Sequence, residues 1–136
     1  MRADHDLAFL MQYENIAWFD GEIVKILDRR VYPSEIRYEI CKTHVEVMQA
    51  IRDMVTQSAG PYSAAPMGMA LAAHECEGQA PEQRLEYLKM AAECISNARP
   101  TTKKRLEISC AESLRAAEEA VLNGKDITSA VFENTV

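Results

Sequence analysis

Hydrophobic positions follow a period of two up to about residue 42 and a helical period after it. Apolar segments at 16–19 and 22–28 are separated by Asp20 and Gly21. An Asp-Gly pair between apolar segments predicts a tight hairpin turn, because glycine reaches positive φ at low cost. Within the segment 22–28, Ile23 and Leu27 fall on one face and Val24 and Ile26 on the other, so we expect this strand to be covered on both faces.

A third strand is expected over 35–41, after a break at Pro33 and Ser34. In this segment apolar and charged residues alternate, which is typical of a half-buried strand with one wet face. The apolar positions are Ile36, Tyr38 and Ile40, and the charged positions are Glu35, Arg37 and Glu39. The three strands together predict a small antiparallel sheet.

From Thr43 onward the pattern becomes helical. Thr43 and Glu46 form a T-H-V-E capping box, in which the Thr43 hydroxyl accepts from the Glu46 amide and Glu46 reaches back. The apolar positions that follow recur with helical spacing and predict a helix to about residue 55 or 57. Further helices are expected over about 67–76, 81–97, 102–122 and 127–134, with stop or start signals at Asn97–Pro100, Asn123–Gly124 and Asp126.

These elements predict an α+β fold that is mostly α, with a three-stranded antiparallel sheet followed by four to five helices. The chain of 136 residues, with 48% hydrophobic and 26% charged residues, is expected to form a single domain. Residues 1–42 would form an extension and the small sheet, and residues 43–136 the helical part. Apolar stripes at helical spacing are interpreted as core.

The charge of the chain excludes some classes of partner. The formal net charge is −6, which argues against a general nucleic-acid binder or a protein of acidic membrane surfaces. The basic cluster Lys103–Lys104–Arg105 is interpreted as a solvated helix start. No apolar run approaches the roughly 18 residues that a membrane span needs, and the N-terminus lacks the pattern of a secretory signal. A cytoplasmic location is therefore expected.

The residues of the chain do not point to a metal or a cofactor. The four cysteines, Cys41, Cys76, Cys94 and Cys110, lack the spacing of a zinc site and are expected to be buried, reduced thiols. His74 is interpreted as a satisfied core or edge histidine. Glu118 and Glu119 are interpreted as solvated residues of a helix.

The uncharged tract QSAGPYSAAPMG, residues 57–68, separates two helical segments. Its glycines, prolines and serines predict a loop, which is either a connector or backbone shaped to meet a ligand. The tract is longer than most connections between packed helices, which have about two to eight residues. This length favours a loop with a function.

The order of several segments resembles the N-terminal domain of the methylthioribose-1-phosphate isomerase family. That family includes ribose-1,5-bisphosphate isomerase and the regulatory subunits of translation initiation factor 2B. The resemblance covers roughly residues 16–120, and the order and spacing of its motifs carry it more than any single motif. The segments are 16–28 (IAWFDGEIVKILD), 47–55 (VMQAIRDMV), 56–63 (TQSAGPYS), 68–73 (GMALAA) and 97–101 (NARPT).

The resemblance implies a sugar-phosphate site. Gln57, Ser58 and Ala59 stand where the family has an R-G-A motif whose arginine and backbone amides hold the phosphate. Arg99 matches an arginine that reaches toward the substrate phosphate, although it could also simply cap the preceding helix. Gln57 cannot supply the positive charge, and Ser58 has less backbone freedom than glycine. The tract is therefore interpreted as an altered or vestigial sugar-phosphate loop.

Three functions remain open. The first is the N-terminal domain or subunit of an isomerase that converts an aldose 1-phosphate into a ketose 1-phosphate in methionine salvage. The family's catalytic cysteine and aspartate lie in a C-terminal Rossmann-like domain that this chain is expected to lack. The chain would then contain no catalytic residue, be inactive alone, and need a catalytic partner chain or self-association. The second function is a non-catalytic binding or regulatory module, and the third is a purely structural helical protein.

Overall fold

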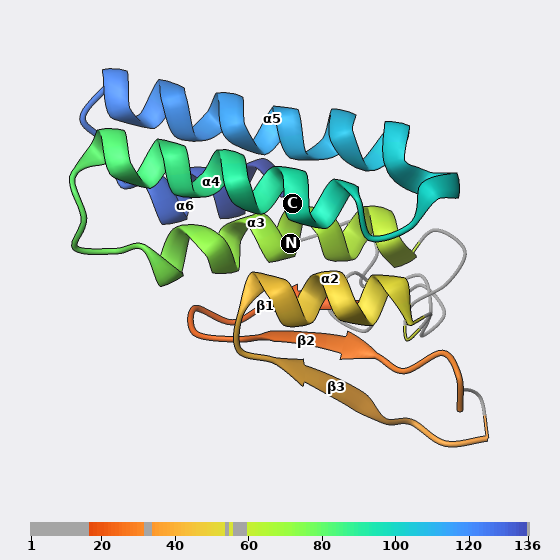
Figure 1. The fold of residues 1–136 in the computed structure, drawn as a ribbon. Coiled ribbons are helices and arrows are strands. Elements are labelled where there is room, and N and C mark those ends of the chain that lie inside the picture. Colours follow the sequence, from red (N-terminus) through yellow and green to blue (C-terminus); the bar gives the residue numbers. More distant parts are fainter. Residues whose placement is uncertain (1–16, 32–33, 54, 56–59, 136) are drawn as a thin grey trace.

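The structure is a computed structural model that describes residues 17–31, 34–53, 55 and 60–135. A three-stranded antiparallel sheet is followed by helices, so the predicted α+β, mostly α fold is confirmed (Figure 1). The strands are β1 (Ala17–Phe19), β2 (Val24–Leu27) and β3 (Tyr38–Cys41). The helices are α2 (His44–Arg52), α3 (Gly60–Glu75), α4 (Pro81–Ser96), the short 3-10 helix η2 (Pro100–Thr102), α5 (Lys103–Leu122) and α6 (Ile127–Thr135).

The sheet has the strand order β1-β2-β3, and both pairs of neighbours are antiparallel. The turn between β1 and β2 is the Asp-Gly hairpin that the sequence predicts. The Asp20 carboxylate accepts hydrogen bonds from the amides of Glu22 and Ile23, each at 2.9 Å. Gly21 has a φ of 110°, which explains why glycine occupies this position.

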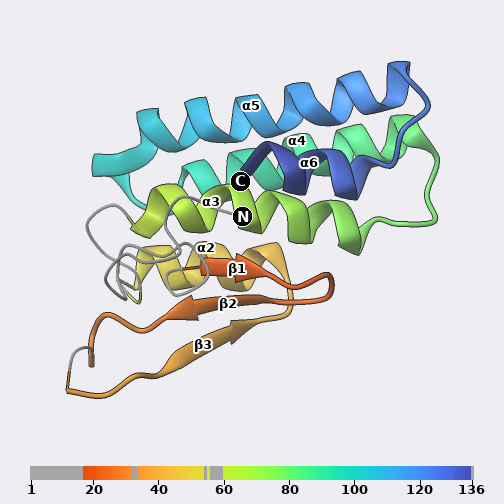
Figure 2. The same ribbon diagram turned by 180° about the vertical axis from the view of Figure 1, so that it is seen from behind.

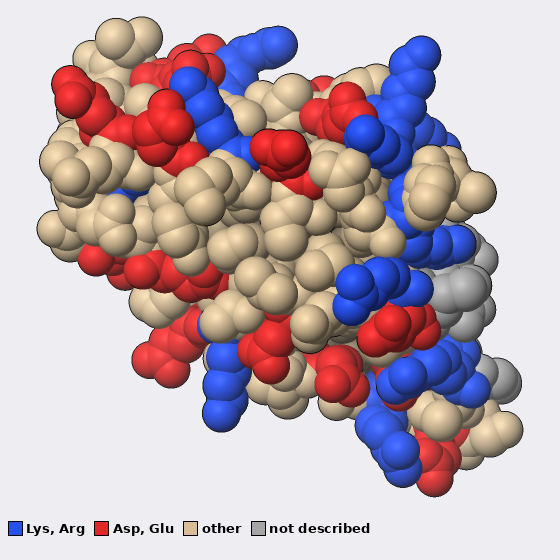
Figure 3. Space-filling view, in the orientation of Figure 1, with Lys and Arg blue, Asp and Glu red and all other residues tan. Residues whose placement is uncertain are grey.

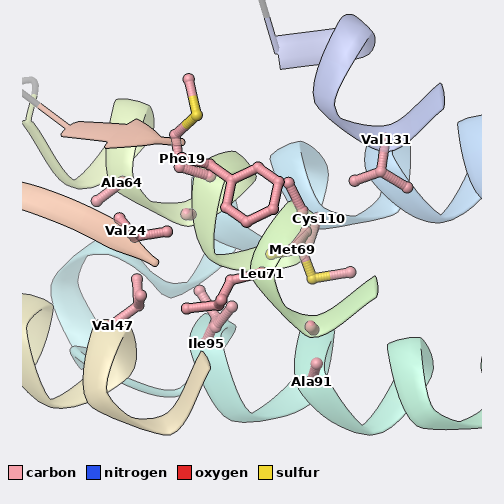
Figure 4. Close-up of a cluster of buried hydrophobic side chains, with 14 of the residues drawn as sticks. Phe19, Val24, Val47, Ala64, Met69, Leu71, Ala91, Ile95, Cys110 and Val131 are labelled. Atoms are coloured by element: carbon pink, nitrogen blue, oxygen red, sulfur yellow. The ribbon is translucent and has the colours of Figure 1, made fainter. Parts of the chain in front are cut away.

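The elements are arranged around α3. Figures 1 and 2 show the sheet along one side, α5 on the far side, and α4 and α6 on opposite sides of α3. Helix α3 contacts α2, α4, α5, α6, β1 and β2. In the core, Figure 4 shows Met69 and Leu71 of α3 among side chains from the sheet and from the other helices, including Phe19, Val24, Val47, Ile95, Cys110 and Val131.

Helix α3 corrects the interpretation of the tract 57–68. The predicted loop is helical from Gly60 onward, so the helix begins seven residues before the expected start at Met67. Pro66 lies inside it. Nearly every described side chain from Ala64 to Ala73 is buried, so the helix has no polar face and its sequence carries no helical period. Burial against the surrounding elements outweighs the low helix propensity of glycine and proline.

Strand β3 also departs from the prediction. Its apolar face is directed away from the core: Ile36 is 62% exposed, Ile40 is 44% exposed, and Tyr38 is half-buried. Glu39 pairs with the buried Ile26 and is exposed as well. Of the residues in this strand, Cys41 reaches the core. The strand lies at the sheet edge, beyond the part that the helices cover, and alternation alone cannot tell which face a helix will cover.

The predicted start of α2 and the predicted stop of α5 are confirmed, whereas α2 ends at Arg52, before the predicted residue 55 or 57. Thr43 caps α2, and its hydroxyl accepts from the Glu46 amide at 3.2 Å. Glu46 reaches back to the amide of Lys42 at 2.7 Å, one residue before the cap. At the end of α5, Gly124 has a φ of 66° and the amide of Lys125 donates to the carbonyl of Ala120, as in a Schellman motif.

Candidate functional site: a basic end of the helical bundle

Three helix ends meet at one end of the helical bundle, and the resemblance connects Arg99 and the tract that precedes α3 with phosphate binding. Helix α3 begins there, α4 ends there, and η2 leads directly into the start of α5 (Figures 1 and 2). Gln57, Ser58 and Ala59 lie outside the described residues. In the sequence they immediately precede Gly60, the first residue of α3. The backbone amides that begin a helix have no partner within it, so this end offers hydrogen-bond donors.

Arg99 lies at this end, between α4 and η2. It is half-buried, has an extended backbone (φ −142°, ψ 130°), and precedes the first residue of η2. Its carbonyl accepts from the amide and the hydroxyl of Thr102, each at 3.3 Å. These bonds anchor the backbone of Arg99.

The guanidinium of Arg99 forms no hydrogen bond or ion pair with another described residue. The end of α4 has a cap of its own, because the Asn97 side chain donates to the Glu93 carbonyl at 2.7 Å and the Asn97 amide donates to it at 3.2 Å. Capping of α4 therefore does not require Arg99.

The electrostatics of this end favour an anion. Lys103, Lys104 and Arg105 are the first three residues of α5, and the first turns of both α3 and α5 contain no acidic residue. Positive side chains at a helix N-terminus add to the partial positive charge of the helix dipole, which is normally balanced by acidic residues. Figure 3 shows Lys and Arg gathered along this end of the molecule, although the net charge of the chain is −6.

A hollow of about 200 Å³ lies at the junction of α3 and α5. The Arg105 guanidinium stacks over the Tyr62 ring, 4.1 Å from its centroid. Such stacking leaves the N–H groups, which lie in the plane of the guanidinium, free for other acceptors. The lining residues are Tyr62, Arg105, Ile108, Ser109 and Glu112.

Burial disfavours the reactive thiolate form of two of the described cysteines. All four are free thiols; Cys41, Cys76 and Cys110 are buried and Cys94 is half-buried, which confirms the expected buried state for three of them. Burial raises the pKa of Cys41 to about 12 and that of Cys110 to about 11. These two thiols are therefore protonated at neutral pH and unreactive.

Neither a metal-binding cluster nor a membrane-spanning helix occurs in the described part of the chain. Its His, Cys, Asp and Glu side chains form no group of three that could hold a metal ion. Its helices include none that is both long enough and apolar enough to cross a membrane.

A hydrogen-bonded cluster at the opposite end of α3 was missed by sequence reasoning. The Glu75 carboxylate accepts from the His44 amide, from the Tyr87 hydroxyl, and pairs with His44 Nδ1 at 2.7 Å. The His44 and Tyr87 rings meet edge to face, with their centroids 5.5 Å apart. His44 and Tyr87 are 31 and 12 positions from Glu75 along the chain and form no motif with it, so the cluster has no sequence signature.

The cluster changes the acidity of its members. Burial by itself would raise the pKa of Glu75, but hydrogen bonds from His44 and Tyr87 outweigh burial and hold this pKa below its usual value. Burial and the adjacent carboxylate raise the pKa of Tyr87. A carboxylate at a helix C-terminus is disfavoured by the dipole, so its three donors are needed to stabilise it. The cluster joins α2, α3 and α4 and is structural in character.

Neighbouring bonds attach α6 to the same end of α3. Arg84 donates to the Ala73 carbonyl at 2.9 Å and to the Thr128 hydroxyl at 3.1 Å, and this hydroxyl donates to Glu77 at 3.1 Å. His74 is half-buried and its Nδ1 lies 3.0 Å from Glu77, so its interpretation as a satisfied edge histidine is confirmed.

Curated proteins with similar sequences include methylthioribose-1-phosphate isomerases. A methylthioribose-1-phosphate isomerase from Thermoanaerobacter sp. (strain X514) is 36% identical over 84 residues, which cover 61% of this chain and 24% of that protein. One from Syntrophus aciditrophicus (strain SB) is 33% identical over 92 residues, 67% of this chain and 25% of that protein. The chain thus spans about a quarter of the length of these relatives. No family model matches the sequence.

Solved structures share the fold. The 5-methylthioribose 1-phosphate isomerase from Pyrococcus horikoshii OT3 aligns with a TM-score of 0.76 at 24% identity, covering 89% of this chain and 34% of that one. The delta subunit of translation initiation factor eIF-2B from A. fulgidus aligns with a TM-score of 0.71 at 26% identity and the same coverage. Both alignments include most of the sheet-and-helix architecture described above.

Proposed function

The chain belongs to the family of methylthioribose-1-phosphate isomerase and initiation factor 2B subunits, and from this premise we propose that it forms the N-terminal, phosphate-holding part of a sugar-phosphate isomerase. The proposed reaction converts an aldose 1-phosphate, methylthioribose 1-phosphate, into the ketose 1-phosphate in methionine salvage. The observation that carries the proposal is the convergence of Arg99 with two acid-free helix starts at one basic end of the bundle.

Each component of this end suits a phosphate monoester. Arg99 has an anchored backbone and a guanidinium without a described partner, so it can donate two parallel hydrogen bonds to phosphate oxygens. The first amides of α3 can supply further donors next to Gln57, Ser58 and Ala59. The basic start of α5 adds long-range attraction for a dianion.

The proton transfers of the isomerisation need a positioned acid and base. We propose that these come from a second domain or from a partner chain, which would close over the basic end. The proposal is supported by the quarter-length match to the curated isomerases and by the high pKa values of Cys41 and Cys110. This chain alone is then expected to bind the phosphate without turning the substrate over.

A second candidate is a non-catalytic binding or regulatory module. Gln57 in place of the family's arginine favours it, because the loop loses its strongest contact with a phosphate. The likeness to an initiation factor 2B subunit is consistent with it as well. The two candidates differ in whether the basic end binds a sugar phosphate.

Calorimetric titration of the full chain with methylthioribose 1-phosphate separates them, with methylthioribose as the ligand that lacks the phosphate. We expect binding of the phosphate ester alone. Arg99→Ala should weaken it about tenfold or more, the cost of a charge-assisted hydrogen bond. Arg115→Ala is the matched control, because Arg115 is exposed on α5 away from this end, and it should change the affinity less than twofold.

A gain-of-function variant tests the role of the loop. Gln57→Arg restores the family's charge and should tighten binding of the phosphate ester. Absence of binding by both the natural chain and Gln57→Arg would favour the non-catalytic module. Turnover by the purified chain alone would contradict the assignment of the acid and base to another domain or chain.

A further inference from the structure

Strand β3 has an open edge. Among the described residues the sheet ends at β3, whose far side pairs with no strand (Figure 1). The Asp28 amide donates to the Arg37 carbonyl at 2.8 Å, so the backbone groups of Arg37 face β2. Glu39 and Cys41 follow at intervals of two residues and also face β2. Because backbone groups alternate in direction along a strand, the N–H and C=O groups of Tyr38 and Ile40 point to the open edge.

The open edge carries an apolar row. Ile36 is 62% exposed, Ile40 is 44% exposed, and Tyr38 lies between them. The Lys25 ammonium sits 4.6 Å from the centre of the Tyr38 ring and covers part of this row. Exposed apolar edge strands are unusual in natural proteins, because they invite pairing with another strand.

We propose that two copies of this chain pair through β3, antiparallel and centred on Tyr38, to form a six-stranded sheet across the two molecules. In this register Arg37 lies opposite the partner's Glu39, and Glu39 lies opposite the partner's Arg37. On the other face Ile36 lies opposite the partner's Ile40. The sequence 36–40 is therefore complementary to itself in both charge and hydrophobicity.

Charge selects this register over its neighbours. A shift of the pairing by two residues in one direction places Glu39 opposite the partner's Glu39. A shift in the other direction places Arg37 opposite the partner's Arg37. Like charges directly opposite each other on paired strands are destabilising, whereas opposite charges are favourable.

The backbone supports the same register. In antiparallel pairs, residues whose N–H and C=O groups face the partner exchange hydrogen bonds, and the residues between them bring their side chains closest together. Tyr38 and Ile40 face the open edge, so they can form the hydrogen-bonded pairs. Arg37 and Glu39 then occupy the closely spaced positions that suit an ion pair.

The size of the contact predicts its strength. A strand of four residues with one apolar row forms an interface at the low end of specific protein contacts. The dimer is therefore expected to be reversible and dependent on concentration. The residues of this edge are separate from Arg99 and the start of α5, so the inference does not depend on the phosphate site.

Sedimentation velocity of the full chain over a concentration series tests the pairing. The natural chain should shift from monomer toward dimer as the concentration rises. Arg37→Glu and Glu39→Arg each place like charges opposite each other twice, and each should weaken association about tenfold or more. The double variant Arg37→Glu/Glu39→Arg restores opposite charges and should recover dimerisation.

An equimolar mixture of the two single variants gives the most specific readout. One variant is acidic and the other basic at both positions 37 and 39, so they should form a heterodimer although neither self-associates. Circular dichroism confirms that the variants are folded, which is expected because Arg37 and Glu39 are exposed. A natural chain that stays monomeric, or a double variant and a mixture that fail to associate, would overturn the proposal.

Discussion

At the scale of single residues, Glu75 stabilises the joint between three helices. Its carboxylate terminates α3, accepts from the first amide of α2 through His44, and accepts from Tyr87 of α4. Side chains of His44 and Glu75 are 11% and 14% exposed, so water does not easily replace these bonds. Removing an acceptor from buried donors costs more than the bond itself contributes, because the donors remain without partners.

The first prediction concerns Glu75→Gln and pH. The pKa of Glu75 is lowered in the folded chain, so its contribution to stability is complete above its unfolded pKa of about 4.5 and is lost as pH falls through the folded pKa. The variant keeps an acceptor oxygen but loses the charge. We expect it to lower the free energy of unfolding by about 1–2 kcal/mol at pH 7. The difference should shrink toward pH 3, as measured by urea denaturation.

Tyr87→Phe is the control for this prediction. It removes one hydrogen bond but leaves the carboxylate titrating, so it should cost about 1 kcal/mol and retain most of the pH dependence. An equal loss for Glu75→Gln at pH 7 and pH 3 would show that the charge of Glu75 does not contribute.

At the scale of elements, α3 depends on close approach by its neighbours. A Cβ atom at Gly68 would lie 2.9 Å from Val47 Cγ1 of α2 and 3.0 Å from Ile95 Cδ1 of α4. Real Cβ atoms essentially never show the first distance, and the second is unusually tight, so Val47, Ile95 or the helices that carry them would have to shift. Gly68 therefore has a packing role, and the spacing between α2, α3 and α4 depends on it.

The second prediction is that Gly68→Ala destabilises the fold. Alanine favours a helix over glycine by about 1 kcal/mol, whereas overpacking in a dense core costs about 1–3 kcal/mol. We expect a net loss of about 1 kcal/mol in denaturant unfolding. The χ1-restricted Val47 cannot move aside easily, so Val47→Ala in the Gly68→Ala background should recover part of the loss. Additive losses in the double variant would contradict the proposed clash.

The elements also show which parts of the fold can be predicted from the sequence. Signals that act within a few residues are reliable here: the Asp20–Gly21 hairpin, the Thr43 cap and the Gly124 stop are confirmed by hydrogen bonds or dihedral angles. Features decided by tertiary surroundings were missed. The part of helix α3 from Ala64 to Ala73 is almost wholly buried and lacks a periodic pattern, and the covered face of β3 depends on how the helices pack on the sheet.

The candidate site, too, could be predicted only in part from the sequence. Arg99 was identified through the family resemblance, and the structure adds that its backbone is anchored at the basic end. Gln57, Ser58 and Ala59 stay predictions, because they lie outside the described residues. Lys103, Lys104 and Arg105 are exposed at the start of α5, as the interpretation of a solvated helix start predicts, and their position next to the start of α3 depends on the tertiary fold.

At the scale of the whole molecule, the charge is distributed unevenly. The chain is acidic overall, yet the end where α3 and α5 begin is basic (Figure 3). Helix α5 has 20 residues and is therefore about 30 Å long, roughly three Debye lengths at 0.1 M salt. A charge at the far end of α5 is therefore screened and has little effect on a ligand that binds at the basic end.

The third prediction uses this separation. Lys104→Glu reverses a charge at the start of α5, and Lys125→Glu reverses one just after its end. If a phosphate ester binds at the basic end, Lys104→Glu should weaken binding by about three- to tenfold at low salt. Lys125→Glu should change the affinity less than twofold, because its charge is screened over the length of the helix. Calorimetry at two salt concentrations measures both effects.

Stability does not confound this comparison. An acidic residue in the first turn of α5 stabilises the helix by about 0.3–1 kcal/mol through the helix dipole. Lys104→Glu also places two negative charges at positions 104 and 107, which costs a few tenths of a kcal/mol. The net change in folding free energy is therefore small. The loss of affinity should also diminish as salt rises, since the interaction between Lys104 and the ligand is screened. Equal weakening by both variants at all salt concentrations would place the phosphate elsewhere on the molecule.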